Sequence, residues 1–422
     1  MATPLRSFLE VAPDSHFPLE NLPYGIFRPN DGRPRAGVAI GAQVLDLAAL
    51  EEAGHFRGAG LGERPVFQKP VLNNFLALGR PAWLKVRAIL QDLLAADTAT
   101  LRDDDALRAR VFHRQSNVAM QLPVRVGDYT DFYSSYHHAF NVGTMFRGAE
   151  NAIMPNWRHL PIAYHGRASS IVASGADVRR PQGQTKAPDA SAPSFGPSKA
   201  LDFELETAFL IGPPNELGEA VPIAQATDHI FGLVLMNDWS ARDIQTWEYQ
   251  PLGPFLAKNF CTSISPWVVT LEALAPFRRP LPAQDPEPFP YLRAPEDFVF
   301  DVQLEVALQS TKMSAPQTIA RSNMRNLYWS IAQQLAHHTV GGCNLQPGDL
   351  LASGTISGPE ENARGSMLEL TWRGANPLTL PGGETRKWLD DGDRLTIRGW
   401  AEGDGYRVGF GEVQGKVVAA RT

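Results

Sequence analysis

Cysteine is the scarcest residue type in this chain, with only Cys261 and Cys343 among 422 residues. Two cysteines exclude a disulfide framework and a cysteine-rich zinc or iron–sulfur site. Positive charge is not in excess either, because 39 lysines and arginines stand against 45 acidic residues, for a net charge of -6. This balance argues against nucleic acid as the main partner.

Long hydrophobic runs are also missing. No segment is long and apolar enough to span a bilayer, so we expect no membrane partner. The N-terminus has no charged leader followed by an apolar stretch, so we expect no signal peptide and a cytoplasmic protein. The chain has no GxxxxGK[ST], Gly-x-Ser-x-Gly or HExxH motif. The adjacent pairs His137-His138 and His337-His338 lack the spacing of zinc ligands.

Proline and glycine, in contrast, are plentiful, with 34 and 36 copies. They favour a turn-rich β protein over a helical bundle. The length predicts two domains, which we place at residues 1–118 and 119–422. The first reads as a small mixed unit with short strands near residues 24–28, 37–40 and 43–47. An amphipathic helix follows Pro81.

The larger second part reads mostly as strands and turns, so we expect a mainly β protein. Two helices stand out in it. One is predicted to begin near Ser240, with Asp243 as its capping-box partner. The other is predicted over residues 322–338 and ends before Gly341-Gly342. The loops rich in proline, glycine and serine around these elements are expected to be surface excursions.

The segment over residues 201–211 alternates apolar and acidic residues before it becomes wholly apolar. In a strand, Asp202, Glu204 and Glu206 would share one face. Carboxylates at this spacing repel one another unless a cation neutralises them. The alternative is a solvated strand face, and this segment alone does not decide between the two.

Three other places carry polar side chains suited to chemistry. Residues 128–138 combine acids, phenols and two imidazoles, and histidine transfers protons well near neutral pH. An apolar strand is predicted to end at Asp238, and the helix after it would present Arg242, Gln245 and Tyr249 on one face. This face is either solvated or binds a substrate carboxylate. Lys258 follows in apolar surroundings. Glu369 is expected on a strand, either half exposed or orienting a histidine.

Long motifs in these regions resemble the fumarylacetoacetate hydrolase family, and they extend from about residue 128 to 411. The matching stretches are DYTDFYSS, HAFNVGTMFRG, LPIAYHGRASS, LDFELE, VLMNDWSARDIQ, WEYQPLGPFLAK, LLASGTISG, GSMLEL and GDGYRVGFG. The resemblance implies a small SH3-like N-terminal barrel and a large C-terminal β-sandwich or β-roll, in a homodimer. It also implies hydrolysis of the carbon–carbon bond of 4-fumarylacetoacetate to fumarate and acetoacetate, the last step of tyrosine and phenylalanine breakdown.

The resemblance further implies roles for individual residues. His138 would be the catalytic base, oriented by Glu369, and strand alternation would turn His137 away from the site. The ligands of a divalent cation, Ca²⁺ or Mg²⁺, would be Asp131, Glu204, Glu206 and Asp238. A further magnesium-type position would involve Asp238, Lys258 and Thr262, although we expect Lys258 mainly to contact substrate. The substrate contacts would be Tyr133, Arg147, Tyr164, Arg242, Gln245, Tyr249, Lys258 and Thr355. Asp202 has no place in this set, and for it we keep the solvated face.

The expected mechanism is attack by a water that His138 deprotonates, with Arg242, Gln245 and Lys258 stabilising the oxyanion. Two alternatives remain. A decarboxylase, hydratase or isomerase of the same superfamily would keep the carboxylates but differ around the base. A non-catalytic calcium-binding module would leave His138, Arg242 and Lys258 without a role.

Overall fold

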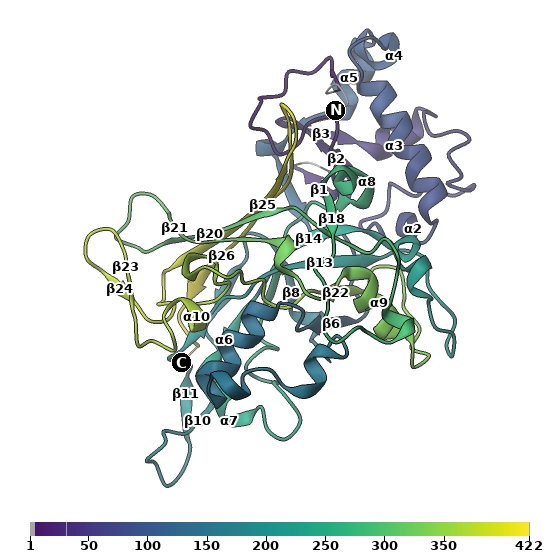
Figure 1. Cartoon of the computed structure of the whole chain (residues 1–422). Helices are drawn as coiled ribbons and strands as arrows, with labels where there is room; N and C mark the ends of the chain where they lie inside the picture. The colour runs from purple at the N-terminus through teal and green to yellow at the C-terminus, as the bar shows by residue number, and fades with distance from the viewer. Residues whose placement is uncertain (1–4, 31, 422) are drawn as a thin grey trace.

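The computed structural model describes residues 5–30 and 32–421. Three sheets organise the chain, and Figure 1 shows the N-terminal part at the top, above the two sheets of the C-terminal part. The first sheet is antiparallel, in the order β4-β3-β2-β1-β5. Its strands are β1 (Tyr24–Pro29), β2 (Arg35–Ile40), β3 (Gln43–Asp46), β4 (Phe112–Arg114) and β5 (Val118–Gln121). The helices beside it are α1 (Leu47–Glu52), α2 (Asn73–Leu76), α3 (Arg80–Leu94), α4 (Ala99–Arg102) and α5 (Asp105–Val111).

The central sheet has eight strands, in the order β7-β6-β22-β13-β14-β16-β8, with β17 also paired to β14. These strands are β6 (Tyr129–Phe132), β7 (Ala163–His165), β8 (Ile171–Ala173), β13 (Leu205–Ile211), β14 (Ile230–Asp238), β16 (Thr262–Ile264), β17 (Val269–Thr270) and β22 (Leu350–Ala352). Every residue of β13 and β14 is buried. Strands covered on both faces read as continuous apolar runs, which explains the sequence of β14.

The third sheet has the order β21-β20-β25-β26-β9. Its strands are β9 (Asp177–Arg179), β20 (Gln303–Gln309), β21 (Gln317–Asn323), β25 (Arg394–Glu402) and β26 (Arg407–Val418). Small ribbons complete the strands: β10 (Gln182–Thr185) with β11 (Ser194–Pro197), β12 (Leu201–Asp202) with β15 (Ser240–Ala241), β18 (Arg278–Pro280) with β19 (Phe298–Phe300), and β23 (Leu378–Thr379) with β24 (Thr385–Arg386). The helices of this part are α6 (Tyr136–Arg147), α7 (Arg242–Glu248), α8 (Leu271–Leu274), α9 (Ile331–Thr339) and α10 (Met367–Leu370).

Two apolar cores lie on opposite faces of the central sheet. Phe209 and Leu235 face the third sheet, where they pack in one cluster with Ile397 and Phe410. Side chains of the other face, including Leu210 and Met236, pack with the N-terminal strands and helices. Both cores hold the central sheet in place, and α6 and α7 are drawn below it in the view of Figure 1. The mainly β architecture is confirmed. In the part of the chain that is described, no helix combines the length and apolarity needed to cross a membrane.

Three predicted elements are wrong in detail. The acidic segment is not one strand, because β12 ends at Asp202 and β13 begins at Leu205, with Glu204 in an isolated bridge to Ser366. The helix predicted over residues 322–338 begins only at Ile331, because β21 pairs with β20 up to Asn323. Its true start has a capping box between Ser330 and Gln333, worth about 1 kcal/mol.

The segment that contains Glu369 is also not a strand. It forms the short helix α10, whose N-cap Ser366 accepts a hydrogen bond from the Glu369 amide. The capping box predicted for α7 is wrong as well, because its N-cap residue is Ala241 and makes no side-chain cap. Asp243 accepts instead from Ser198 Oγ at 2.6 Å and from the Lys199 amide at 2.7 Å, so it fastens α7 to the segment between β11 and β12.

Candidate active site

Four buried carboxylates meet at the ends of strands β6, β13 and β14 of the central sheet. Asp131 lies in β6, Glu206 in β13 and Asp238 at the end of β14, while Glu204 precedes β13. Strands β13 and β14 pair directly, and β22 lies between β6 and β13, where its residue Ala352 pairs with both Asp131 and Ala208. One oxygen from each carboxylate lies within 4.8 Å of the others. The predicted ligand set is therefore assembled in one place.

The free oxygens of this cluster fit a bound cation. Neither oxygen of Glu206, nor Oδ1 of Asp131, accepts a hydrogen bond from the described residues. Burial raises the pKa of Asp131 and Glu206 well above the ordinary carboxyl range, and neighbouring carboxylates raise it further. Buried carboxylates without partners are costly, whereas a hard cation takes such oxygen ligands. The donor set fits a divalent cation such as Ca²⁺ or Mg²⁺.

Lys258 already supplies one positive charge to the cluster. Its Nζ lies 2.5 Å from Glu204 Oε2 and 2.7 Å from Asp238 Oδ2. Burial opposes the charge of Lys258, but Asp238 and Glu204 raise its pKa above the ordinary value. A protonated ammonium has no lone pair for a metal, so in this state Lys258 is a counter-charge. Thr262 Oγ1 donates to Asp238 Oδ1 at 2.8 Å and orients that carboxylate.

His138 and Glu369 form a hydrogen-bonded pair. Nδ1 of His138 lies 2.7 Å from Oε2 of Glu369, and both residues are buried. Asn141 Nδ2, Ser357 Oγ and Ser366 Oγ also donate to Glu369, each at 2.9 Å. Burial would raise the pKa of Glu369, but His138, Asn141 and Ser366 lower it below its ordinary value. An ionised Glu369 holds the proton on Nδ1, which leaves Nε2 of His138 to accept one.

The prediction that strand alternation separates His137 from His138 is wrong. His137 and His138 lie in the first turn of α6, which Ser135 caps by accepting from the His138 amide, so strand alternation does not apply. Successive helical residues still point in different directions. His138 is buried against Glu369, whereas His137 is half-buried with its ring edge-on to Tyr136.

A cavity of about 710 Å³ connects the carboxylates, His138 and the predicted substrate residues. Asp131 and Glu204 line it from the cluster, and His138 lines it from α6. All the predicted substrate contacts line it as well: Tyr133, Arg147, Tyr164, Arg242, Gln245, Tyr249, Lys258 and Thr355. Apolar walls come from Val142, Phe146, Ile162, Leu252, Leu368 and Trp388. One cavity therefore joins a cation site, a proton acceptor and cationic donors.

Several of these side chains are held in defined positions. Arg242 Nη1 donates to Gln245 Oε1 at 3.1 Å, and Tyr164 donates to Asp238 Oδ2 at 3.2 Å. Arg147 donates to the backbone carbonyls of Asn151 and Ala152, which follow α6. Its charge has no acidic partner among the described residues. The Thr355 hydroxyl is buried and bonds to no described group. Arg147 and Thr355 thus offer unused capacity for a polar, anionic ligand.

The solvated position predicted for Asp202 is wrong. Its side chain is fully buried, and Arg242 Nε donates to its Oδ2 at 2.8 Å. The solvated face was predicted because Asp202 has no place in the ligand set that the resemblance implies, yet Asp202 is bonded to Arg242 and to the first amides of α10. Asn141, Ser357 and Ser366 around Glu369 were not among the predicted site residues. All three lie within the motifs that resemble the family, which is the signal that could have found them.

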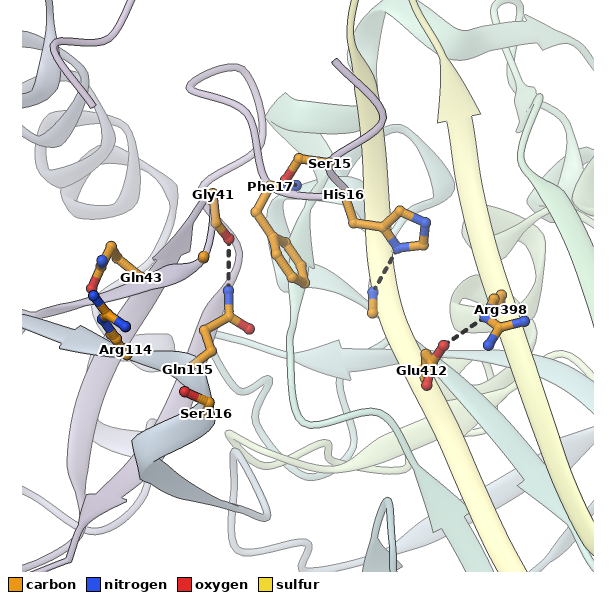
Figure 2. Close-up of a pocket in the computed structure, with 12 residues that line it drawn as sticks. Ser15, His16, Phe17, Gly41, Gln43, Arg114, Gln115, Ser116, Arg398 and Glu412 are labelled. Atoms are coloured by element: carbon orange, nitrogen blue, oxygen red, sulfur yellow. Dashed lines mark hydrogen bonds and ion pairs between the residues drawn. The ribbon is translucent and has the colours of Figure 1, made fainter. Parts of the chain in front are cut away.

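A second cavity of about 720 Å³ separates the N-terminal sheet from β25 and β26 (Figure 2). Several of its polar groups pair with one another. Arg398 pairs with Glu412 at 2.5 Å, Gln115 Nε2 donates to the Gly41 carbonyl, and the Gly411 amide donates to His16 Nδ1. This groove lacks the convergent acid, base and donors of the first cavity, so the candidate active site is the first one.

Comparison with known proteins shows the family of this chain. The family described as "Fumarylacetoacetate (FAA) hydrolase C-terminal" matches residues 129–418, and "Fumarylacetoacetase N-terminal" matches residues 20–123. The chain belongs to the fumarylacetoacetate hydrolase family. Curated relatives within the family include the fumarylacetoacetases of Bos taurus, 58% identical over 98% of this chain and 99% of the relative, and of Homo sapiens, 57% identical over the same shares.

Two solved structures share the fold at much lower identity. The fumarylacetoacetate hydrolase of Exiguobacterium antarcticum has a TM-score of 0.53 at 17% identity, and the match covers 95% of this chain and 100% of that chain. A putative HpcE protein from Mycobacterium smegmatis has a TM-score of 0.52 at 18% identity, and the match covers 94% of this chain and 99% of that chain. At this identity, the likeness concerns the fold alone.

Proposed function

We propose that the protein is a hydrolase that cleaves the carbon–carbon bond of 4-fumarylacetoacetate to fumarate and acetoacetate. The His138–Glu369 pair carries the proposal, because His138 lines the same cavity as Asp131 and Glu204 of the carboxylate cluster. The fumarylacetoacetases at 57–58% identity over nearly the whole chain support this substrate and a place in tyrosine and phenylalanine catabolism. A non-catalytic calcium module is disfavoured because it has no use for a buried proton acceptor.

The reaction begins with deprotonation of water. Glu369 fixes the tautomer of His138, so Nε2 accepts a proton from a water in the cavity. The hydroxide adds to the ketone carbon of the fumaryl group, which becomes a carboxyl carbon of fumarate. Arg242, Gln245 and Lys258 donate toward the oxyanion that forms, and losing one such donor typically costs about 3–4 kcal/mol in the barrier.

The carbon–carbon bond then breaks, and its electron pair moves onto the acetoacetate fragment as an enolate. His138 returns its proton to the enolate carbon that held the broken bond, which yields acetoacetate. The other fragment leaves as fumarate. A divalent cation on the carboxylates supplies Lewis-acid polarisation of the substrate oxygens. The cations Arg147, Arg242 and Lys258 are suited to a dianionic substrate.

Finer assignments belong to the same proposal. The cation is Ca²⁺ or Mg²⁺, with Asp131, Glu204, Glu206 and Asp238 as ligands and a second position near Lys258 and Thr262. The N-terminal sheet corresponds to an SH3-like barrel, with domains at residues 1–118 and 119–422. The C-terminal part corresponds to a β-sandwich or β-roll. The protein acts in the cytoplasm as a homodimer. Exposed apolar side chains beyond α7, such as Leu252 and Phe255, are compatible with an interface.

The direct test is substrate turnover by the purified protein and by His138→Asn. We expect the wild type to consume fumarylacetoacetate and release fumarate, and His138→Asn to lose at least about 100-fold in kcat, the range of general-base catalysis. His137→Asn is the matched control and should keep its activity, because its ring packs on Tyr136. Full activity of His138→Asn would refute the assigned base, and an inactive wild type would refute the function.

A further inference from the structure

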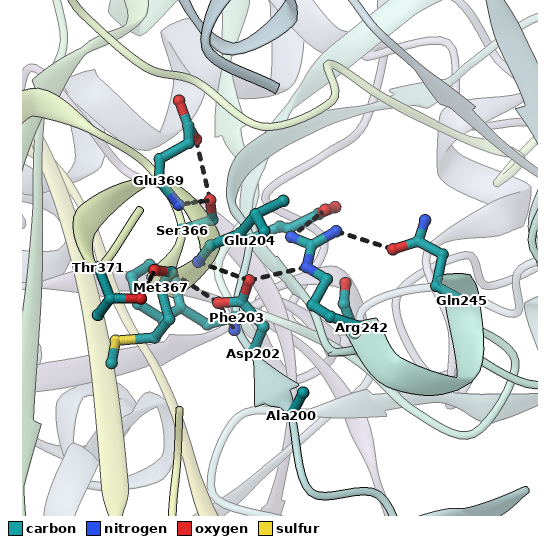
Figure 3. A network of polar contacts seen from close by, with 12 residues as sticks. Ala200, Asp202, Phe203, Glu204, Arg242, Gln245, Ser366, Met367, Glu369 and Thr371 are labelled. Atoms are coloured by element: carbon teal, nitrogen blue, oxygen red, sulfur yellow. Dashed lines mark hydrogen bonds and ion pairs between the residues drawn. The ribbon is translucent and has the colours of Figure 1, made fainter. Parts of the chain in front are cut away.

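Asp202 accepts four hydrogen bonds, although it lies outside the metal ligands and the cavity lining (Figure 3). Oδ1 accepts from the amides of Phe203 and Met367, at 2.8 and 2.6 Å. Oδ2 accepts from the Leu368 amide at 3.0 Å and from Arg242 Nε at 2.8 Å. Burial raises the pKa of Asp202, while Arg242 and the Leu368 amide oppose this. Because all four partners are donors, the ionised carboxylate is the form that fits.

The first arm of this network fixes Arg242. Its Nε is held by Asp202, and its Nη2 lies 2.7 Å from Glu204 Oε1. The Nη1 group donates to Gln245, which lines the cavity beside it. Without Asp202, the guanidinium would keep only Glu204 as a charged partner and would be drawn toward the carboxylate cluster. Asp202 therefore sets how Arg242 faces the cavity.

The second arm fixes the helix that carries Glu369. Met367 and Leu368 are the first two residues of α10, and the first amides of a helix have no acceptor within it. Asp202 accepts from both amides, so it determines where α10 starts. Glu369 is the next residue and holds His138 through Oε2. The carboxylate of Asp202 thus connects Arg242, the donor on one side of the cavity, with the helix whose Glu369 orients His138.

We propose that Asp202 is a positioning residue that holds Arg242 and Glu369 in a fixed relation, so that oxyanion donor and activated water reach the substrate together. This inference rests on the proposed hydrolysis. An asparagine has nearly the same shape, but its amide would turn two protons toward groups that are themselves donors. Asp202→Asn therefore disturbs the network with little change in volume.

The test compares Asp202→Asn with Asp393→Asn. Asp393 is equally buried and holds Arg386 through two hydrogen bonds of 2.9 and 3.0 Å near β24. We expect Asp202→Asn to lower kcat by roughly 10- to 100-fold, less than the roughly 100- to 1,000-fold for removing an oxyanion donor itself. Its KM should change much less. Asp393→Asn should lower the melting temperature to a similar degree as Asp202→Asn, because each substitution removes a buried charge that holds an arginine. Its kcat should stay within about twofold of the wild type, because neither Asp393 nor Arg386 lines the cavity.

A double-mutant cycle separates positioning from general destabilisation. If Asp202 acts through its two arms, Asp202→Asn should lower kcat by less than about twofold in a protein that already carries Arg242→Gln and Glu369→Gln, because coupled residues are not additive. An equal loss of kcat in the wild-type background and in this doubly substituted background would overturn the proposal. An unchanged kcat in Asp202→Asn alone would also overturn it. Such results leave wild-type turnover intact, so they are distinct from failure of the proposed function.

A second variant covers a failure of Asp202→Asn to fold. Asp202→Ser leaves room for waters to satisfy the four donors, so it should fold and show the same loss of kcat. If neither variant folds, Asp202 has a purely structural role and the proposal is overturned.

Discussion

Glu206→Gln should have opposite effects on the metal-free and metal-loaded protein. Glu206 is a buried carboxylate whose two oxygens accept no hydrogen bond within the described ranges. Without a cation it adds only repulsion to the cluster. With a cation it is a ligand. Glutamine preserves the shape and removes the charge, so the metal-free protein should be equally stable or more stable, while metal binding weakens.

The sizes of both effects follow from the geometry. The carboxylate oxygens lie within 4.8 Å of one another. Two unit charges at that distance repel by about 3.5 kcal/mol at an effective dielectric constant of about 20, which sets the scale of the relief for each carboxylate neighbour. The raised pKa of Glu206 acts against this gain, because a protonated carboxyl carries no charge to relieve. A cation at about 100 times its Kd stabilises by about 2.7 kcal/mol, and a 100-fold weaker affinity leaves about 0.4 kcal/mol.

The assay is chemical unfolding of wild type and Glu206→Gln, each with a chelator and with added Ca²⁺ or Mg²⁺. Glu305→Gln removes a carboxylate from β20 in the third sheet, where Glu305 pairs with Arg321. This control should leave the metal-dependent part of the unfolding free energy unchanged. If Glu206→Gln keeps the full metal-dependent stabilisation, or is strongly destabilised without metal, the reasoning about the cluster is refuted.

Two further substitutions test the surroundings of the site. The lowered pKa of Glu369 means that its charge stabilises the fold above the ordinary carboxyl value of 4.5, and that this stability is lost as the pH falls through the lowered pKa. Glu369→Gln should therefore flatten this part of the stability curve in denaturant titrations from pH 7 downward, and an unaltered curve would argue against the ionised pair. Gly354→Ala should destabilise by at least about 2 kcal/mol, because φ is +75° and the new Cβ would lie 2.1 Å from the Phe132 carbonyl oxygen. An unchanged unfolding midpoint would contradict this.

Local sequence patterns correctly predicted two kinds of element: those whose packing partners lie nearby in the sequence, and strands that are buried on both faces. The N-terminal strands and α3 follow directly from periodicity, and the end of β14 at Asp238 follows from the end of its apolar run. The cation ligands and the His138–Glu369 pair came from long motifs, which carry the family's arrangement without showing its geometry.

The errors arose where distant segments decide the local structure. Glu369 looks like a strand residue because Leu368 and Leu370 flank it, yet the amides at the start of α10 take their acceptor from Asp202. The start of α9 was placed too early because β20 extends its partner strand to Asn323. Asp202 looked solvated because it has no place among the cation ligands, whereas its partners Arg242, Met367 and Leu368 lie in α7 and α10. In each case, the deciding contact lies far away in the sequence.

The placement of Glu206 within β13 also has a consequence for folding. A slip of one residue in β13 would turn Glu206 into the core that contains Leu205 and Phe209, where an unpaired charge costs several kcal/mol. Carboxylates that serve the reaction therefore also penalise wrong strand pairing. Lys258 offsets part of their repulsion as the strands meet, before any ion is bound. The pairing that closes the two cores is thus the same pairing that assembles the cation ligands.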